Sequence, residues 1–265
     1  MSSGIKSFDR VADVYDATRG LPPEVEARVA DGIARVLRDA GAAGRVVEFG
    51  VGTGRIAVPL AERGVRVTGV DVSPKMLGVL RGKRPDVAVV LSEASRTPFR
   101  DAAFAAAIFV HILHLVPDAD ATVREAFRVV RPGGLLLSGG DARFVGIEEA
   151  IRDLQEALIT KHSGQDENLH QRYAVARTIV ADVVRERGGA VESMVLARWQ
   201  RATTGREVLE RLRRRDFSGS WRIKDEALPA VVAEMEAELT RLLGSLDQEL
   251  RFERAFGLVV GRGWR

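Results

Sequence analysis

The chain has 265 residues, no cysteine, and a net charge of +3 from 40 basic and 37 acidic side chains. The absence of cysteine excludes disulfides, thiolate metal sites and thiol nucleophiles, and so small a positive excess argues against a nucleic-acid partner. The longest apolar run, residues 102–110, is far shorter than the roughly 20 residues of a membrane span. Residues 1–10 lack the apolar stretch of a signal peptide. We therefore expect a cytoplasmic protein with no membrane span.

Apolar strand-like runs alternate with helical segments between residues 22 and 138. A helix is predicted from residue 22 to about residue 40, because Pro22 and Pro23 favour the first helical positions and apolar residues follow at helical spacing. Short apolar runs, typical of buried parallel strands, are expected to form strands at 45–49, 65–70, 87–91, 105–110 and 135–138. Helices are expected at 56–63, after the capping residue Ser73, and at 121–130. This alternation predicts an α/β fold with a mostly parallel sheet and helices on both faces.

The C-terminal part shows a different pattern. Helices are predicted at 146–162, 171–188, 206–215 and 225–246, strands at 191–203 and 250–260, and a polar loop at 163–170. The segment 144–187 follows the fifth strand, near the edge of the sheet where ligands bind in such folds. We therefore expect a single domain over residues 1–265, with a helical insertion at 144–187 that forms a substrate lid.

Three glycines at alternate positions, Gly50, Gly52 and Gly54, follow the first predicted strand and precede a helix. Glycine lets the backbone turn sharply and approach a ligand closely, and a helix N-terminus favours a carboxylate or phosphate. Asp71 stands at the end of the second strand, where a carboxylate can accept hydrogen bonds from both hydroxyls of a ribose. Glycines that serve packing alone would not explain why strand, turn, helix and terminal acid fall in order. The segment therefore predicts a ligand that contains a ribose.

Two classes of ligand fit the glycine spacing. A dinucleotide calls for G-x-G-x-x-G or a final alanine, and the run from Gly52 through Gly54 to Ala57 satisfies that pattern, so spacing does not exclude NAD. Glu48 is the better discriminator, because an acid two residues before the first glycine is unfavourable near a pyrophosphate. It suits a ligand with an ammonium group, such as the methionine end of S-adenosylmethionine (SAM).

At these residues the sequence resembles the class I SAM-dependent methyltransferases, above all the group with the ubiquinone- and menaquinone-biosynthesis enzymes and many small-molecule methyltransferases. Five segments carry the resemblance in chain order: 8–16, 48–54, 70–77, 93–99 and 124–134. They are similar to the family's N-terminal arm, first motif, second-strand motif, adenine-edge segment and helix-to-fifth-strand signature. The resemblance implies a Rossmann-like, seven-stranded, mostly parallel sheet with an antiparallel C-terminal strand, and an arm over the cofactor at residues 1–20.

The resemblance also implies how SAM is held. The backbone of residues 50–54 would hold the methionine portion, Glu48 would orient its amino end, and Asp71 would bind the ribose. The remaining implied cofactor residues are Tyr15 and Arg19 from the arm, Val72, Met76 beside the adenine, Glu93 and Ala94 at the adenine edge, and Val110 and His111 at the methyl-transfer site. Glu93 departs from the family pattern, in which Asp is more usual.

The chemistry places few demands on protein side chains. SAM carries its own leaving group, so a protein base is needed only if the acceptor must lose a proton. His111 follows the fourth strand, and the ordinary histidine pKa of about 6.5 suits proton transfer near neutrality, so His111 is the candidate base. His114 is interpreted as a packed or capping residue. No third ligand accompanies the two histidines, so no metal site is predicted.

The acceptor is narrowed by exclusion. Covalent pyrimidine C5 methylation needs a cysteine, and residues 111–114 replace the Asn/Asp-Pro-Pro-aromatic turn of exocyclic amine methylation in nucleic acids. The arginines at 211 and 213–215 are interpreted as a solvated helix end. We predict methyl transfer to a small molecule, with O-, N- or C-methylation and the oligomeric state left open. An RNA or protein methyltransferase and a non-catalytic SAM-binding module stay as alternatives.

Overall fold

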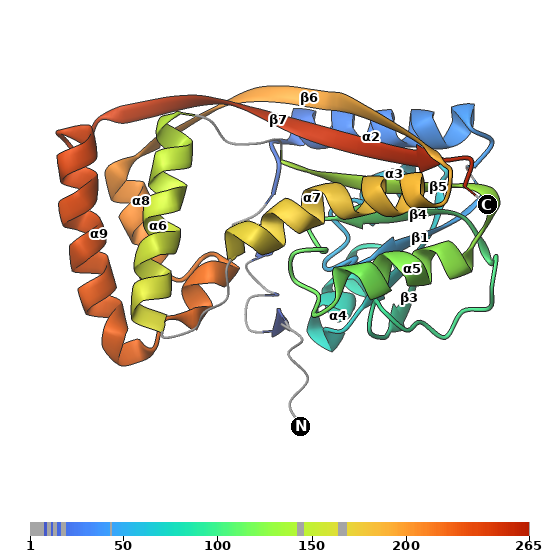
Figure 1. Cartoon of the computed structure of the whole chain (residues 1–265), viewed down its shortest axis with the longest axis horizontal. Coiled ribbons are helices and arrows are strands. Elements are labelled where there is room, and N and C mark those ends of the chain that lie inside the picture. The colour runs from blue at the N-terminus through green and yellow to red at the C-terminus, as the bar shows by residue number, and fades with distance from the viewer. Residues whose placement is uncertain are drawn as a thin grey trace. The chain divides into compact units, whose positions relative to one another are not determined.

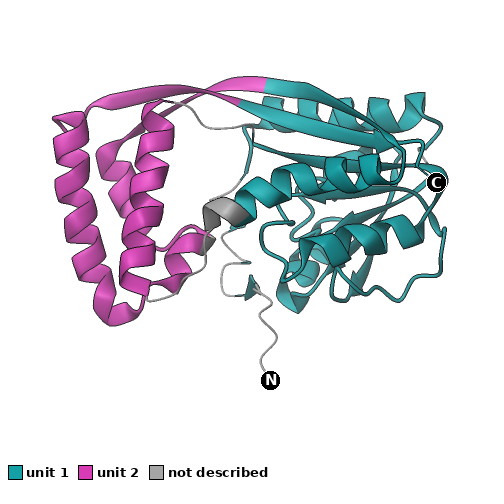
Figure 2. Ribbon diagram, viewed as in Figure 1, with its two compact units in different colours: residues 1–141, 172–197, 255–265 teal, residues 142–171, 198–254 magenta. Residues whose placement is uncertain are grey.

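The computed structural model describes residues 8–9, 12, 15–16, 20–42, 44–141, 146–163 and 169–264. The chain divides into two compact units, shown in different colours in Figure 2. Unit 1 comprises residues 1–141, 172–197 and 255–265, and unit 2 comprises residues 142–171 and 198–254. The strands β6 and β7 each contribute residues to both units.

The described residues form a seven-stranded sheet with the order β3-β2-β1-β4-β5-β7-β6. The strands are β1 (Arg45–Phe49), β2 (Arg66–Asp71), β3 (Ala88–Leu91), β4 (Phe104–Val110), β5 (Val130–Asp141), β6 (Ala190–Thr204) and β7 (Glu249–Arg262). The pairs β1–β2, β1–β4, β2–β3 and β4–β5 are parallel, and β7 runs antiparallel to β5. The predicted Rossmann-like sheet with an antiparallel C-terminal strand is confirmed.

The strand order reverses between β1 and β4, because β2 and β3 lie on one side of β1 and β4 lies on the other. Every residue of β4 is buried, as expected for a central parallel strand that is covered on both faces. In open parallel sheets, ligands bind beyond the carboxyl ends of the strands where the order reverses. The topology therefore directs attention to the residues that follow β1 and β4.

Helices cover both faces of the sheet (Figure 1). In unit 1 they are α2 (Pro23–Asp39), α3 (Ala57–Glu62), α4 (Pro74–Lys83), α5 (Ala119–Val129) and most of α7 (Leu169–Glu186). On one face, α5 and α7 pack Val123, Phe127 and Val184 against sheet residues that include Phe49 and Phe109. The hydroxyl of Ser73 caps α4 by accepting the N–H of Met76, which confirms the cap expected there.

The fifth strand begins earlier than the sequence predicted. Residues 132–134, which separate the predicted helix at 121–130 from the predicted strand at 135–138, lie inside β5, which starts at Val130. The pairing with β4 shifts register between Phe104 and Ala106, and Gly133 has a φ of +73°. Irregular pairing tolerates proline and glycine within a strand, so the turn-like sequence forms a bulge there.

Unit 2 contains the helices α6 (Ile147–Ser163), α8 (Gly205–Arg213) and α9 (Leu228–Leu243), and the 3-10 turns η2 (Ser218–Arg222) and η3 (Asp225–Ala227). Its core is apolar, with Leu209, Met235 and Leu239 almost fully buried. The segment 144–187 is helical as expected, but α6 belongs to unit 2 and α7 mostly to unit 1. Its role as a lid stays a prediction.

None of the helices in the described ranges is both long and apolar enough to cross a membrane.

Candidate functional site

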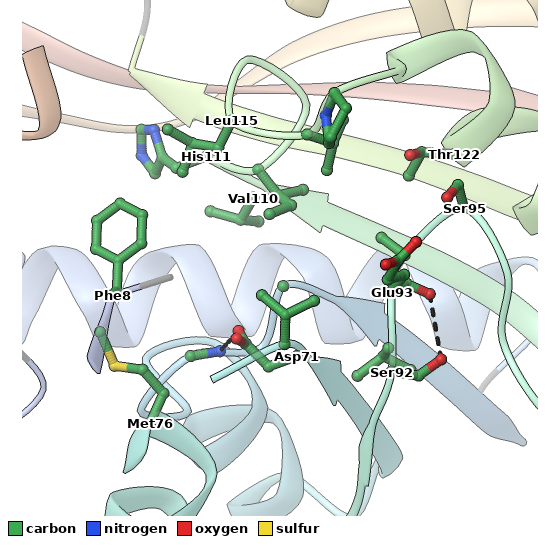
Figure 3. A pocket seen from close by; sticks show the side chains of 18 of the residues that line it. Phe8, Asp71, Met76, Ser92, Glu93, Ser95, Val110, His111, Leu115 and Thr122 are labelled. Atoms are coloured by element: carbon green, nitrogen blue, oxygen red, sulfur yellow. Dashed lines mark hydrogen bonds between the residues drawn. The ribbon is translucent and has the colours of Figure 1, made fainter. Parts of the chain in front are cut away.

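A cavity of about 360 Å³ opens in unit 1 beyond the carboxyl ends of β1, β2, β3 and β4 (Figure 3). Its walls come from the glycine turn after β1, from the ends of β2 and β4, and from the turn after β3. A cavity of this volume falls in the range that holds cofactors and small ligands. The cavity lies at the point where the strand order reverses, where the fold predicts a ligand site.

Most of the residues predicted to bind a cofactor line this cavity. They are Tyr15, Gly50, Gly52, Asp71, Val72, Met76, Glu93, Ala94, Val110 and His111. Glu48 and Gly54 are not part of the lining, and Arg19 lies outside the described residues. The structure thus brings residues from five separate sequence segments together, and their contacts with SAM stay a prediction.

The three glycines of the turn have left-handed backbones, with φ of +69° at Gly50, +54° at Gly52 and +86° at Gly54. A Cβ atom at Gly50 would collide with Ile112, and one at Gly54 would collide with Leu80. At Gly52 a Cβ atom would meet no protein atom within 4 Å. Gly50 and Gly54 therefore serve packing, whereas Gly52 keeps space open on the cavity side of the turn.

Asp71 connects the end of β2 to the glycine turn. Its Oδ2 accepts the N–H of Gly52 at 2.9 Å (Figure 3). Its Oδ1 accepts the N–H of Ser73 at 2.9 Å. Burial raises the pKa of Asp71, and these backbone hydrogen bonds oppose the rise. Each carboxylate oxygen can accept more than one hydrogen bond, so a carboxylate fixed in this way can still accept ribose hydroxyls.

Glu48 is buried behind the glycine turn, with 2 % of its surface exposed. Burial raises its pKa to about 8, and the charge of Asp71 adds to the rise, while Arg55 and the N–H of Ala57 at the start of α3 oppose it. Its Oε2 is buried without a hydrogen-bond partner in the described part of the chain. Glu48 therefore supports the start of α3, and its predicted role at the amino end of a ligand stays a prediction.

Two groups of residues lie on opposite sides of Asp71 in Figure 3. Glu93, Ser95 and Thr122 lie on one side, and Phe8 and His111 lie on the other. The hydroxyl of Ser92 donates to the backbone oxygen of Arg96 at 3.0 Å, which fixes the turn that carries Glu93. The order from Glu93 through Asp71 to His111 agrees with the expected order of adenine, ribose and methyl-transfer site.

The two histidines after β4 have different surroundings. His111 lines the cavity with a left-handed backbone, φ +54°, and its Nε2 lies 3.8 Å from Oδ1 of Asp141 at the end of β5. His114 stacks on Tyr173 of α7, with ring centroids 4.2 Å apart. His114 is a packed residue, as interpreted from the sequence, and it does not line the cavity.

Two carboxylates connect the N-terminal arm to the rest of unit 1. Asp9 accepts the hydroxyl of Ser73 and, at 3.3 Å, the N–H of Lys75 at the start of α4. Asp16 accepts the hydroxyl of Thr53 at 2.6 Å and pairs with Lys83, whose ammonium also donates to the Thr53 backbone oxygen at 3.0 Å. The described arm residues that line the cavity are Phe8 and Tyr15, whose rings meet edge to face.

Sequence reasoning missed part of the lining. The missed residues are Phe8, Val70, Ser92, Ser95, Ile112, Leu115, Val116, Pro117, Asp118 and Thr122. Asp118 had a detectable signal, because an Asp before a predicted helix is a favoured N-cap, and its carboxylate accepts the N–H of Ala121 at 2.9 Å. The apolar residues Ile112, Leu115, Val116 and Pro117 carry no motif, since only tertiary structure brings this loop to the cavity.

Fold and site together define a class of protein. A glycine turn after β1, an acid at the end of β2 and a cavity where the strand order reverses are the features of a Rossmann-like nucleoside-binding domain. Residues 47–138 match the family model described as "Methyltransferase domain". This part of the chain matches a methyltransferase domain, which confirms the resemblance stated from the sequence.

Curated relatives match less than half of this chain. An uncharacterized methyltransferase of Mycobacterium tuberculosis is 41 % identical over 95 residues, which cover 36 % of this chain and 39 % of the relative. The demethylmenaquinone methyltransferase of Beutenbergia cavernae is 36 % identical over 137 residues, which cover 49 % of this chain and 54 % of the relative. The matched segments span between 39 % and 55 % of the length of these curated relatives, so the chain covers about half of each of them.

Solved structures show the same fold. A putative methyltransferase from Bacillus halodurans has a TM-score of 0.56 at 18 % identity, covering 89 % of this chain and 100 % of that one. An N-methyltransferase of Haemonchus contortus, solved with phosphomonomethylethanolamine and S-adenosylhomocysteine, has a TM-score of 0.52 at 16 % identity, covering 97 % of this chain and 58 % of that one. At these identities the likeness concerns the fold alone.

Proposed function

We propose that this protein is a SAM-dependent methyltransferase that acts on a small-molecule acceptor. One observation carries the proposal: a single cavity joins the open glycine turn, the fixed carboxylate of Asp71 and the imidazole of His111. The match of residues 47–138 to a methyltransferase domain supports it. Two of the curated relatives, a demethylmenaquinone methyltransferase and a malonyl-[acyl-carrier protein] O-methyltransferase, modify quinone-type and acyl acceptors according to their names.

The residues fit SAM. Asp71 is held by two backbone N–H groups and faces the cavity, as a ribose acceptor must. Open space at Gly52 gives the methionine portion access to the turn. Ala94, next to Glu93, supplies apolar surface for the adenine. Met76 lies on the Phe8 side of Asp71 in Figure 3, so its place beside the adenine stays a prediction. When bound, SAM supplies a methyl group on a positively charged sulfur, which leaves as a neutral thioether.

Protein residues would orient the acceptor and exclude water. Beyond His111 the loop after β4 presents apolar residues to the cavity, namely Ile112, Leu115, Val116 and Pro117. An apolar wall removes water from the reacting groups, which strengthens electrostatic interactions there. Holding the acceptor in line with the methyl group can lower the barrier by as much as about 7–11 kcal/mol in well-oriented systems.

The arginines near residue 213 support a small molecule over RNA. In unit 2 these guanidinium groups are paired with acidic side chains, as in the ion pairs Arg213–Glu210, Arg213–Glu236, Arg214–Asp216 and Arg215–Asp225. Paired cations offer less charge to a phosphate backbone than free ones, and phosphate contacts dominate nucleic-acid affinity. The interpretation of this cluster as a solvated helix end agrees with the exposed side chains of Arg213 and Arg214, whereas the side chain of Arg215 is only 14 % exposed.

Calorimetry and a turnover assay test the proposal. SAM and S-adenosylhomocysteine should bind with one site per chain, and NADH should not bind. Release of S-adenosylhomocysteine should then be measured with small phenols, amines and quinols, and with RNA and protein extracts as competing acceptor classes. NADH binding without SAM binding would reject the function. Turnover only with RNA, lost as salt is raised, would replace the small-molecule acceptor with RNA.

A further inference from the structure

His111 is held in an unusual position at the cavity. Among the described residues, three non-glycine residues have a positive φ, and His111 is the one of them that lines the cavity. A left-handed backbone at a residue with a side chain costs free energy, so surrounding contacts must maintain it. Such a residue at a ligand site points to a functional reason for its position.

In the described part of the chain, three residues lie close to the imidazole of His111. A Cβ atom at Gly140 would lie only 3.3 Å from Cε1 of the ring, so the ring lies directly against the bare backbone of β5. Phe256 of β7 presents its ring edge to face, with centroids 6.4 Å apart. Asp141 places Oδ1 3.8 Å from Nε2, and both side chains are 28 % exposed. All four residues belong to unit 1.

We propose that Asp141 is a positioning residue that orients His111 as a base, and that the acceptor is therefore one that loses a proton on methylation. This inference rests on the proposed function. The distance of 3.8 Å exceeds a hydrogen bond, but catalytic hydrogen bonds are often long in ligand-free structures and shorten when the substrate binds. Hydroxyl, thiol, acidic C–H and protonated amine acceptors fit, whereas tertiary amines do not.

The tautomer of His111 follows from the carboxylate. A carboxylate that faces Nε2 favours the imidazole with its proton on Nε2, which leaves the lone pair of Nδ1 as the proton acceptor. The acceptor's proton goes to Nδ1, and the electron pair of the broken bond forms the new bond to the methyl carbon. The imidazolium that results carries its positive charge beside Asp141, which stabilises it.

Other titratable groups face the same cavity. Among the described residues these are Tyr15 of the arm, Asp71 after β2, Glu93 after β3 and Asp118 before α5. On the elements packed against the ring, β5 contributes Asp141 and β7 contributes the uncharged Phe256. Asp141 is thus the carboxylate whose removal tests the pairing.

The decisive measurement is the titration of His111 in the ligand-free protein by nuclear magnetic resonance. The chain has four histidines, so His111→Gln identifies the His111 signal. An opposite charge nearby favours the charged form, so the wild-type pKa of His111 should lie above the ordinary value of about 6.5. Asp141→Asn should lower it by at least about half a unit, and Asp141→Glu should restore it. Asp120→Asn, on the exposed ion pair with Arg124, is the matched control and should change nothing.

Several results would overturn the inference. A wild-type His111 pKa at or below the ordinary value would overturn it, and this measurement is possible even if Asp141→Asn fails to fold. A His111 pKa in folded Asp141→Asn equal to that of the wild type would also overturn it. Release of S-adenosylhomocysteine with phenol should fall about tenfold or more in His111→Gln and Asp141→Asn. If the wild type releases S-adenosylhomocysteine with N,N-dimethylaniline but not with phenol, the acceptor is not one that loses a proton, and the inference is contradicted. If calorimetry finds no SAM binding, the proposed function fails separately, because the titration needs no SAM.

Discussion

Asp71 is the side chain on which ligand affinity should depend most. It faces the cavity and holds the N–H of Gly52 at 2.9 Å. Each hydrogen bond to a charged group contributes about 1.5–3 kcal/mol, so Asp71→Ala should weaken SAM binding by about 10- to 150-fold for each ribose bond lost. Calorimetry measures the effect, with Asp86→Asn on the exposed ion pair to Arg84 as the control. A dissociation constant equal to that of the wild type removes Asp71 from the site.

Gly52 and Gly64 form a matched pair for a second test. Both have a positive φ, +54° and +79°, and neither has a protein atom within 4 Å of its would-be Cβ. Valine at either position should cost about 1–2 kcal/mol of stability through backbone strain. Gly52→Val should abolish SAM binding and Gly64→Val should not, because Gly52 lines the cavity and Gly64 does not. If both variants fold and bind SAM alike, the glycine turn does not contact the ligand.

Glu48 should make stability depend on pH. Its pKa rises from an ordinary 4.5 to about 8 on folding, so the folded protein holds this proton more tightly than the unfolded chain. The stabilisation is full below about pH 4.5 and is lost as pH rises toward about 8, by up to about 1.4 kcal/mol per unit. Glu48→Gln stays neutral, so its stability relative to the wild type should rise between about pH 5.5 and 7.5. Urea unfolding at several pH values tests this, and a constant difference would contradict the burial argument.

At the scale of elements, the arm should control how long SAM stays bound. Asp16 connects the arm to Thr53 of the glycine turn and to Lys83 of α4, next to the cavity residue Tyr15. Exposed ion pairs contribute at most about 1 kcal/mol, so Asp16→Asn should raise the SAM dissociation rate by about two- to fivefold. Stopped-flow dissociation measures it, again against Asp86→Asn. An unchanged rate would show that these contacts do not hold the arm over the ligand.

The elements of unit 1 were predictable because each has a local signal. Apolar runs predicted the parallel strands. Pro22 and Pro23 predicted the start of α2, and Ser73 predicted the start of α4. The site residues found from sequence share this property, since Gly52 and Asp71 belong to a strand–turn–helix motif of fixed spacing. Asp141 and Phe256 had no such signal. They reach the cavity region through strand pairing and chain contacts between segments far apart in sequence.

At the scale of the whole molecule, two compact units are built from interleaved segments. Unit 2 takes residues from both sides of α7, so no contiguous stretch of sequence marks it. Charge and periodicity describe each of its helices separately but do not indicate that α6, α8 and α9 share one core. This explains why a single domain with one insertion was expected, and why the second unit became visible only in the structure.

The division into units yields a last prediction. The described residues that line the cavity all belong to unit 1, whereas Met235 is fully buried in the core of unit 2. Met235→Ala should destabilise the protein by about 2–5 kcal/mol by leaving a cavity. Below the unfolding transition of this variant, however, its SAM dissociation constant should stay within about threefold of the wild type, since the described residues that line the cavity belong to unit 1 and the change is confined to unit 2.

If residues 144–187 form a substrate lid, the same variant should raise KM for the acceptor while SAM affinity is kept. Calorimetry with SAM and acceptor kinetics separate the two effects. A large loss of SAM affinity in folded Met235→Ala would show that the cofactor site extends to unit 2.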